Sequence, residues 1–413
     1  MKTPDLSPSD EAVPQLDFLF RLTLLLGLVP QSITEASITA SLPEMARDFG
    51  LNGEFAAQMM LGLGALGLMV GALVSGRILE RAGTRRTMLG ALLAFGSFGA
   101  LALASHSIVT LGISRVIVGL SASCIATTCM WGVSAEYEGL ARARIFGISG
   151  AISGFFAIGS VILGGFLAQH LGWRMAFVQF PLMAGAILMV SWRGVPQLLP
   201  EVTQAALKGQ FARLAPLYAL VLMVFAVIGM SGMQLAFLLN ADGLTDAGMR
   251  SLIQGIPGVG VIFGAALYGE VHRRWGGAWA LVLSQSFMTA GLALLVSTQY
   301  IPVLCVGALL QGLCIGMTMP YFYNAVSERT NTGSAQRYLG YLAASTFLGV
   351  FLSPLVFEPV KSQVGTQGLY LLCAGITAVI AAGMAWLERA RATSSTPARP
   401  FLDCEREAAQ QPH

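Results

Sequence analysis

The feature that most constrains this chain is its series of apolar runs, each about as long as a helix that crosses a lipid bilayer. Such a helix needs about 20 mostly apolar residues. Because a backbone in lipid must satisfy its own hydrogen bonds, and the runs are glycine-rich without strand-like alternation, we expect every run to be helical. About twelve runs reach this length: 18–42, 55–79, 87–105, 108–133, 144–168, 173–195, 214–240, 248–271, 278–298, 301–326, 337–358 and 366–388.

The composition points to the same class of all-α membrane protein. Of the 413 residues, 55% are hydrophobic and only 11% are charged, whereas a soluble domain carries about 25% charged residues. A chain of this kind cannot cover a normal water-exposed surface. The six cysteines form no C-x-x-C pair and no basic patch contains interleaved aromatic residues, so we expect no disulfide frame, no metal site and no nucleic-acid partner.

The runs fall into two sets of six, separated by a polar stretch with two prolines. The sequence therefore predicts an N-terminal tail (1–17), a first six-helix bundle (18–195), a linker (196–213), a second six-helix bundle (214–388) and a C-terminal tail (389–413).

The two halves repeat each other at an offset of about 193 residues. Matching pairs are Gly76 and Gly269, Arg81 and Arg274, Gly83 and Gly276, Gly119 and Gly312, and Arg144 and Arg337. Glu35 and Arg115, however, correspond to Ile228 and Ala308. The ionisable groups inside the spans are therefore concentrated in the first half.

The placement of basic residues predicts the orientation. If the N-terminus is cytoplasmic, the cytoplasmic ends and loops hold about 19 Lys and Arg and the outer ones about 4, namely Arg47, Arg174, Arg250 and Lys361. This asymmetry places both termini in the cytoplasm.

A short charged turn, 76–86, joins the second and third runs. Gly83 supplies the turn conformation, Gly76 would let a neighbouring helix approach, and Glu80 stands alone among the arginines. The turn resembles the loop between helices 2 and 3 of the major facilitator superfamily, with Glu80 in place of the usual Asp. Gly76, Arg81, Gly83, Arg85 and Arg86 carry the match. The resemblance implies twelve helices in two pseudo-repeat bundles and a substrate site between the halves.

Glu35 is the candidate proton carrier. It lies inside the first run, where a carboxylate costs about 2.5–3.5 kcal/mol on insertion scales, and it shares a helix face with Gln31 and Thr39 at i, i+4 spacing. Removal from water favours the protonated form, which a proton carrier requires. The alternative is a carboxylate near the outer third of the span that is wet through a vestibule and only structural.

Arg115 is the candidate partner of Glu35. Arg115 and Gly119 resemble the R-x-x-x-G pattern in helix 4 of proton-coupled members of the superfamily, where the arginine is thought to tune protonation of a nearby acid. A guanidinium stays charged, so a pair with Glu35 would favour the carboxylate. The alternative is an arginine that extends to the outer interface, since its run begins near Ile108.

The fifth run resembles the antiporter signature, in which spaced glycines let helix 5 pack closely. The family's Gly-Pro step falls on Ser160 and Val161, so its proline is absent. The glycines that fit the spacing are Gly150, Gly154, Gly159, Gly164 and Gly165.

The second half offers polar rather than charged groups to a central cavity. Together with Gln31 and Thr39, we expect the cavity to be lined by Gln234, Gln254, Gln311, Tyr321, Asn324 and Tyr341. Each of these side chains is alternatively a helix-packing residue.

A second charge cluster is expected at the cytoplasmic ends of the first half, where Glu136 and Arg144 flank the fourth and fifth runs. We expect Glu80 to reach the eleventh run near Arg337 and to latch this side shut. Solvated pairs of this kind contribute under about 1 kcal/mol each, which suits a contact that must reopen.

These features predict a secondary transporter rather than an enzyme, because no catalytic His/carboxylate motif appears. No nucleotide-binding loop appears either, so we expect no cofactor and a proton gradient as the energy source. The resemblance implies a monomeric exporter of a drug, metabolite or siderophore-like compound by proton antiport in the bacterial inner membrane. The alternative is a proton-coupled importer or a facilitator of a sugar, organic acid or other small metabolite.

Overall fold

The computed structural model describes residues 18–50, 53–105, 107–199, 210–330 and 335–394. Every regular element in these ranges is a helix, and ten of the helices are long and apolar enough to cross a membrane. The predicted all-α membrane class is confirmed. The predicted tail 1–17, residues 200–209 of the linker and residues 395–413 of the C-terminal tail lie outside these ranges.

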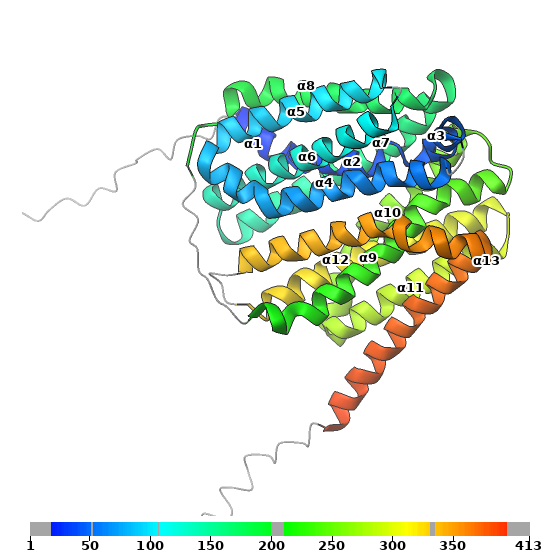
Figure 1. The fold of residues 1–413 in the computed structure, drawn as a ribbon. Coiled ribbons are helices and arrows are strands. Elements are labelled where there is room, and N and C mark those ends of the chain that lie inside the picture. Colours follow the sequence, from blue (N-terminus) through cyan, green and yellow to red (C-terminus); the bar gives the residue numbers. More distant parts are fainter. Residues whose placement is uncertain (1–17, 51–52, 106, 200–209, 331–334, 395–413) are drawn as a thin grey trace, which may run out of the picture.

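The helices form two stacked bundles, which Figure 1 shows as a blue-to-green layer above a green-to-red layer. The first bundle contains α1 (Phe18–Leu26), α2 (Val29–Ala36), the 3-10 helix η1 (Thr39–Ser41), α3 (Leu42–Phe49), α4 (Gly53–Ala82), α5 (Thr84–Ala104), α6 (Ile108–Glu136), α7 (Gly139–Leu171), the 3-10 helix η2 (Trp173–Val178) and α8 (Gln179–Gly194). The second contains α9 (Gln210–Ala241), α10 (Ala247–Trp275), α11 (Gly277–Ser297), α12 (Ile301–Ser327) and α13 (Ala335–Ser394).

The first apolar run is not the single helix that we predicted. It is broken into α1, α2, η1 and α3, and it extends to Phe49 rather than ending at residue 42. Pro30 and Pro43 stand in the first turns of α2 and α3. A proline has no backbone N–H to donate and fits only the beginning of a helix, so each proline marks a restart of the segment.

The other spans agree more closely with the apolar runs. The eleventh and twelfth runs are both contained in α13, which has a non-helical residue at Gly365. Counting the broken first segment and the two parts of α13, the described residues cross the bundle twelve times.

The positive-φ glycines show the repeat directly. Among the described residues there are six, and they form three pairs separated by 193 residues: Gly50 and Gly243, Gly83 and Gly276, and Gly172 and Gly365. L-residues with a side chain resist this conformation. Corresponding turns of the two halves are therefore built in the same way.

Helix packing repeats at the same offset. A Cβ on Gly119 would collide with the carbonyl of Gly64, and a Cβ on Gly312 would collide with the carbonyl of Pro257. Each glycine lets α6 or α12 lie directly against α4 or α10. The same close contact between helices therefore occurs in both halves.

The apolar core of the first half includes an aromatic pair between α5 and α8. The rings of Phe95 and Phe180 lie 5.4 Å apart at 63°, and neither residue is exposed. The second half buries Tyr370 of α13 among apolar neighbours. The core that contains Phe95 and Phe180 also contains residues of the broken first segment.

The two halves meet along two helix pairs, α4 with α13 and α7 with α10. Figure 1 shows the first part of α13 running beside α4 between the layers. Gly62 of α4 faces Phe351 and Pro354 of α13, and a Cβ there would lie 3.4 Å from the carbonyl oxygen of Phe351.

Candidate functional site

The break between α1 and α2 is stabilised by hydroxyl groups of α7. Ser149 Oγ donates to the carbonyl of Leu25 at 2.9 Å, and Ser153 Oγ donates to the carbonyl of Leu28 at 3.1 Å. A broken helix leaves carbonyls without intrahelical donors, and in a membrane these must find other partners. The polar residues of α7 therefore hold the first segment in its broken form.

The second break, after α2, is held by Arg115 of α6. Its Nη2 donates to the carbonyl of Thr34 at 2.6 Å, and its Nε donates to the carbonyl of Met60 in α4 at 3.0 Å. The guanidinium carbon also lies 5.2 Å from the ring centre of Phe180. A cation is favourable at the C-terminal end of a helix, which is where Thr34 lies.

Two expectations for Arg115 are wrong. The residue has no exposed surface, so it does not extend to an outer interface. It also forms no ion pair with Glu35 within 4.0 Å. The physical reason is that the end of α2 and the Met60 carbonyl supply acceptors, and the aromatic ring of Phe180 supplies a favourable π face.

Glu35 itself has exposed surface although its helix is central. α2 packs against α4, α6, α7 and α8, yet the side chain of Glu35 is exposed. No described residue forms a hydrogen bond or ion pair with its carboxylate. An acid without a described partner inside a spanning segment is a candidate for taking up and releasing a proton.

The polar face predicted around Glu35 is shorter than expected. Gln31 is half-buried in the same helix, but α2 ends at Ala36, so Thr39 lies in η1. The Thr39 hydroxyl donates to the carbonyl of Ala36 at 2.8 Å. Thr39 therefore helps to shape the break, and only Gln31 continues the helix face of Glu35.

The predicted cavity residues of the second half differ in their environments. Gln254 and Gln311 are buried. Among the described residues, neither Nε2 nor Oε1 of Gln254 has a hydrogen-bond partner, and Nε2 of Gln311 has none either. Tyr321 is buried against Phe322, with ring centres 5.2 Å apart. Buried amides without partners are the groups in this set that a bound molecule could satisfy.

Two other predicted cavity residues already bind neighbours near the turn at Gly276. Asn324 Nδ2 donates to the hydroxyl of Tyr268 at 2.8 Å. Arg337 Nε donates to the hydroxyl of Tyr341 at 3.2 Å. In this conformation Asn324 connects α12 to α10, whereas the bond between Arg337 and Tyr341 lies within α13.

We call the end with the turns at Gly83 and Gly276 the arginine end, and the end with the turns at Gly50, Gly172, Gly243 and Gly365 the closed end. All hydrogen bonds and ion pairs that join the halves within the described ranges lie toward the closed end. They are Arg47–Asn240, Gln58–Glu358, Gln169–Asp246, Arg250–Ala40, Arg250–Glu44, Ser251–Ile162 and Lys361–Glu54.

Sequence reasoning missed the importance of these residues. Arg250 and Lys361 were expected as outer charges, yet Arg250 has no exposed surface and Lys361 binds Glu54 in the other half. Arg250 stands only four residues after Asp246, whose carboxylate accepts a hydrogen bond at the start of α10. When a charged residue lies near the end of a spanning helix, the sequence does not reveal whether its side chain is buried in the protein or exposed at the interface.

A cavity of about 870 Å³ opens beside these contacts at the closed end. It lies between the halves and has polar groups on both sides. The polar residues in its wall include Arg47, Glu54, Asn240, Glu358 and Ser362.

The arginine end is tied within the first half. Thr84 N donates to the carbonyl of Leu198 at 2.9 Å, and Arg85 Nη2 donates to the carbonyl of Trp192 at 3.0 Å. Gly83 has φ 77°, as its predicted turn role requires. The turn therefore packs on the end of α8 and the chain that follows it.

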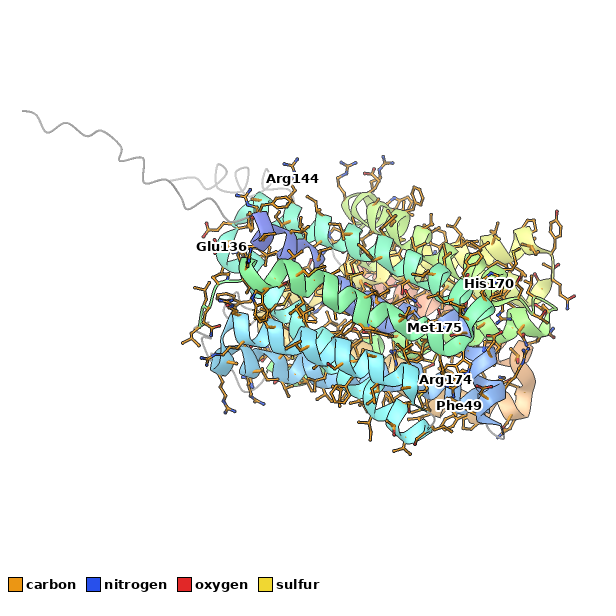
Figure 2. All side chains as sticks on the ribbon, turned by 90° about the horizontal axis from the view of Figure 1, so that it is seen from above. Phe49, Glu136, Arg144, His170, Arg174 and Met175 are labelled. Atoms are coloured by element: carbon orange, nitrogen blue, oxygen red, sulfur yellow. The ribbon has the colours of Figure 1, made fainter. Side chains whose placement is uncertain are left out.

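The other predicted gating residues make no described contact across the halves. Glu80 is half-buried and has no described hydrogen bond or ion pair, while Arg81, Glu136 and Arg144 are exposed. Figure 2 shows Glu136 and Arg144 at one end of the first bundle and Phe49 and Arg174 at the other. A Cβ on Gly76 would meet nothing within 4 Å, so no helix approaches it closely in this conformation.

The glycines of helix α7 divide into two groups. A Cβ on Gly164 would collide with the carbonyl of Ser37, and one on Gly165 would collide with the side chain of Ser251. At Gly150, Gly154 and Gly159 a Cβ would meet nothing within 4 Å. Close packing of α7 is therefore concentrated at its closed-end half, against the first segment and α10.

The two repeated bundles of spanning helices define a multi-pass helical membrane protein. The family model of the Major Facilitator Superfamily matches residues 24–248 and 220–403, and the chain belongs to this superfamily of transport proteins.

Several relatives are resistance proteins. The chain is 27% identical to the chloramphenicol resistance protein of Pseudomonas aeruginosa over 60% of this chain and 61% of that protein. It is 28% identical to multidrug resistance protein 1 of Bacillus subtilis over 64% and 70% of the two chains. An uncharacterised MFS-type transporter of Mycobacterium tuberculosis is 29% identical over 42% of this chain, a match that spans only 25% of that relative's length.

Solved structures share the fold. A mutant of the nucleoside transporter NupG superposes with a TM-score of 0.74 at 12% identity, covering 89% of this chain and 99% of that one. A D-xylose–proton symporter superposes with a TM-score of 0.72 at 17% identity, covering 89% and 97%.

Proposed function

We propose that the protein exports a small organic molecule across the bacterial inner membrane in exchange for protons, with Glu35 as the proton carrier. The observation that carries this proposal is the carboxylate of Glu35 inside a spanning segment, without a described hydrogen-bond or ion-pair partner. An acid in this position is costly and is expected to have a function. The resistance proteins among the relatives favour export of drug-like compounds.

In this proposal the arginine end faces the cytoplasm and the closed end faces the outside. The basic residues gathered at the arginine end favour this orientation. The described conformation is then closed to the outside. The halves alternate by rocking about the broken first segment, which exposes Glu35 to one side at a time.

In this proposal, exchange of substrate for protons follows because the proton and the substrate compete for the carboxylate of Glu35. Glu35 takes a proton from the outside while the substrate leaves, and in the conformation closed to the outside it releases this proton to the cytoplasm while the next substrate binds. Arg115 binds two backbone carbonyls through Nε and Nη2 rather than a carboxylate. It therefore fixes the geometry of α2 and leaves the carboxylate free to change its protonation state.

Everted membrane vesicles with a preformed pH gradient test this proposal. Chloramphenicol, puromycin, cationic dyes, carboxylate metabolites and siderophores would be added singly. We expect one class to collapse the gradient in vesicles with the protein and not in vesicles without it. If labelled compounds cross and none of them moves protons, proton antiport is wrong.

A second candidate is proton-coupled import or facilitated transport of a small metabolite. The observation in its favour is that a riboflavin transporter of Clostridioides difficile is 26% identical over 38% of the chain. In whole cells, import coupled to protons would make the medium alkaline on substrate addition, and a facilitator would leave its pH unchanged.

A further inference from the structure

Arg250 is a second arginine without exposed surface, and most of its hydrogen bonds are within its own half. Its Nη1 donates to the carbonyls of Thr245 at 2.7 Å and Leu244 at 3.0 Å, and to Oδ1 of Asn240 at 3.2 Å. These acceptors surround the turn between α9 and α10. A buried guanidinium with several acceptors in a fixed fork is held in one position.

From this anchored position Arg250 reaches into the other half. Its Nη2 donates to the carbonyl of Ala40 in η1 at 3.3 Å and forms an ion pair with Glu44 in the first turn of α3. Both acceptors belong to the broken first segment. The second half therefore contacts this segment just beyond α2, the helix that carries Glu35.

The break after α2 is consequently held from two sides. Arg115, from the first half, binds the carbonyl of Thr34 before the break, and Arg250, from the second half, binds the carbonyl of Ala40 after it. Gly164 of α7 packs against the carbonyl of Ser37 between them. Residues 37–41 are thus flanked by contacts from both halves at the closed end.

We propose that Arg250 is the positioning residue that links closure of this end to the state of Glu35. When the halves separate at the closed end, Arg250 keeps its acceptors at Asn240, Leu244 and Thr245 and releases Ala40 and Glu44. The break then loses its second support, and α2 changes the side from which Glu35 is reached. The link to proton exchange rests on the proposed function, whereas the clamp on residues 37–41 does not.

The charged environment agrees with this role. Glu44 is the acid that faces Arg250, and the exposed Arg47 lies one turn further along α3, bound to Asn240. Separation of the halves would leave Glu44 beside water at the closed end. The clamp can therefore open without leaving a buried carboxylate without a partner.

The first experiment measures closure without any substrate. Spin labels replace the exposed residues Leu171 and Tyr300, one in each half at the closed end, in a background without the native cysteines. We expect R250Q to move at least about fivefold more of the population to longer distances than wild type, as a coupling of this kind requires. An unchanged distance distribution overturns the clamp.

Two further variants separate this role from general damage. E44A removes the ion pair between the halves and leaves the three own-half acceptors of Arg250 in place, so it stays informative if R250Q does not fold. R47Q removes an exposed hydrogen bond at the same end and should leave the distances as in wild type. If R47Q and E44A act equally, Arg250 has no special role.

The second experiment measures coupling in proteoliposomes loaded with a pH-sensitive dye and given a pH gradient but no substrate. We expect R250Q to leak protons, and E35Q in the same chain to stop the leak. If proteoliposomes with R250Q hold the pH gradient as well as wild type, the link to Glu35 is overturned. It is also overturned if adding E35Q to R250Q leaves the proton leak unchanged. If E35Q alone retains full coupling, the proposed function fails while the distance measurements still decide the clamp.

Discussion

Gly64 leaves the space in which the guanidinium of Arg115 lies. A Cβ at Gly64 would be 2.9 Å from Nη2 of Arg115 and 3.4 Å from Cγ2 of Thr34. The same nitrogen donates to the carbonyl of Thr34 at the end of α2. The geometry of the break near Glu35 therefore depends on a glycine in a neighbouring helix.

We expect G64A to displace this guanidinium and to destabilise the fold by about 1–3 kcal/mol, as overpacking of a buried site does. The matched control is G90A in α5, where a Cβ would meet nothing within 4 Å. Thermal unfolding in detergent measures both variants. Equal stability of G64A and G90A would show that the space beside Arg115 is not required.

The glycines of α7 give a second matched pair. A Cβ on Gly165 would collide with the side chain of Ser251 in the other half, whereas one on Gly159 would meet nothing within 4 Å. We expect G165A to separate the closed end, at a cost of about 1–3 kcal/mol to that conformation, and G159A to leave it closed. Spin labels at Leu171 and Tyr300 report the separation. The prediction is wrong if both variants behave alike.

The carboxylate of Glu358 accepts hydrogen bonds from two residues on different helices. Gln58 of α4 and Gln234 of α9 both donate to its Oε2, at 2.9 and 3.1 Å, and both glutamines are almost fully buried. E358A leaves these amides without their acceptor, at about 1–3 kcal/mol for each. E358Q keeps an acceptor oxygen, so we expect stability to fall from wild type to E358Q to E358A. Unfolding midpoints that place E358A above E358Q would contradict this order.

The orientation of the chain can be tested by labelling. Arg86 is exposed at the arginine end and Tyr300 at the closed end. In a chain without native cysteines, we expect a membrane-impermeant maleimide to label a cysteine at position 300 in intact cells. A cysteine at position 86 should react only after the membrane is opened. The reverse pattern would place the arginine end outside.

Much of the fold was predictable because it depends on composition and on single glycines. The apolar runs predict the spans, and the offset that pairs Gly83 with Gly276 also pairs the turns at Gly50 and Gly172 with those at Gly243 and Gly365. A position that must adopt positive φ is usually occupied by glycine, which can be recognised in the sequence. Local requirements of this kind can be read without the structure.

The site was less predictable because its contacts are to backbone atoms. One carbonyl that Arg115 binds, that of Thr34, lies at the end of α2, where the first segment is broken, and an uninterrupted apolar run conceals that break. A pair between Arg115 and Glu35 was the natural expectation for two charges in a membrane. Arg250 was missed for the same reason, since its acceptors lie in the turn before α10 and in the broken segment.

The most direct test of the central claim compares two kinds of transport by E35Q, using the compound that collapses the pH gradient in the vesicle panel. Accumulation of that compound driven by a pH gradient requires proton exchange, whereas exchange of labelled for unlabelled compound does not. The control is E138Q, which changes an exposed acid at the arginine end. If Glu35 is the proton carrier, E35Q loses gradient-driven accumulation and keeps exchange, while E138Q keeps both. Gradient-driven accumulation by E35Q at the wild-type level would contradict the assignment.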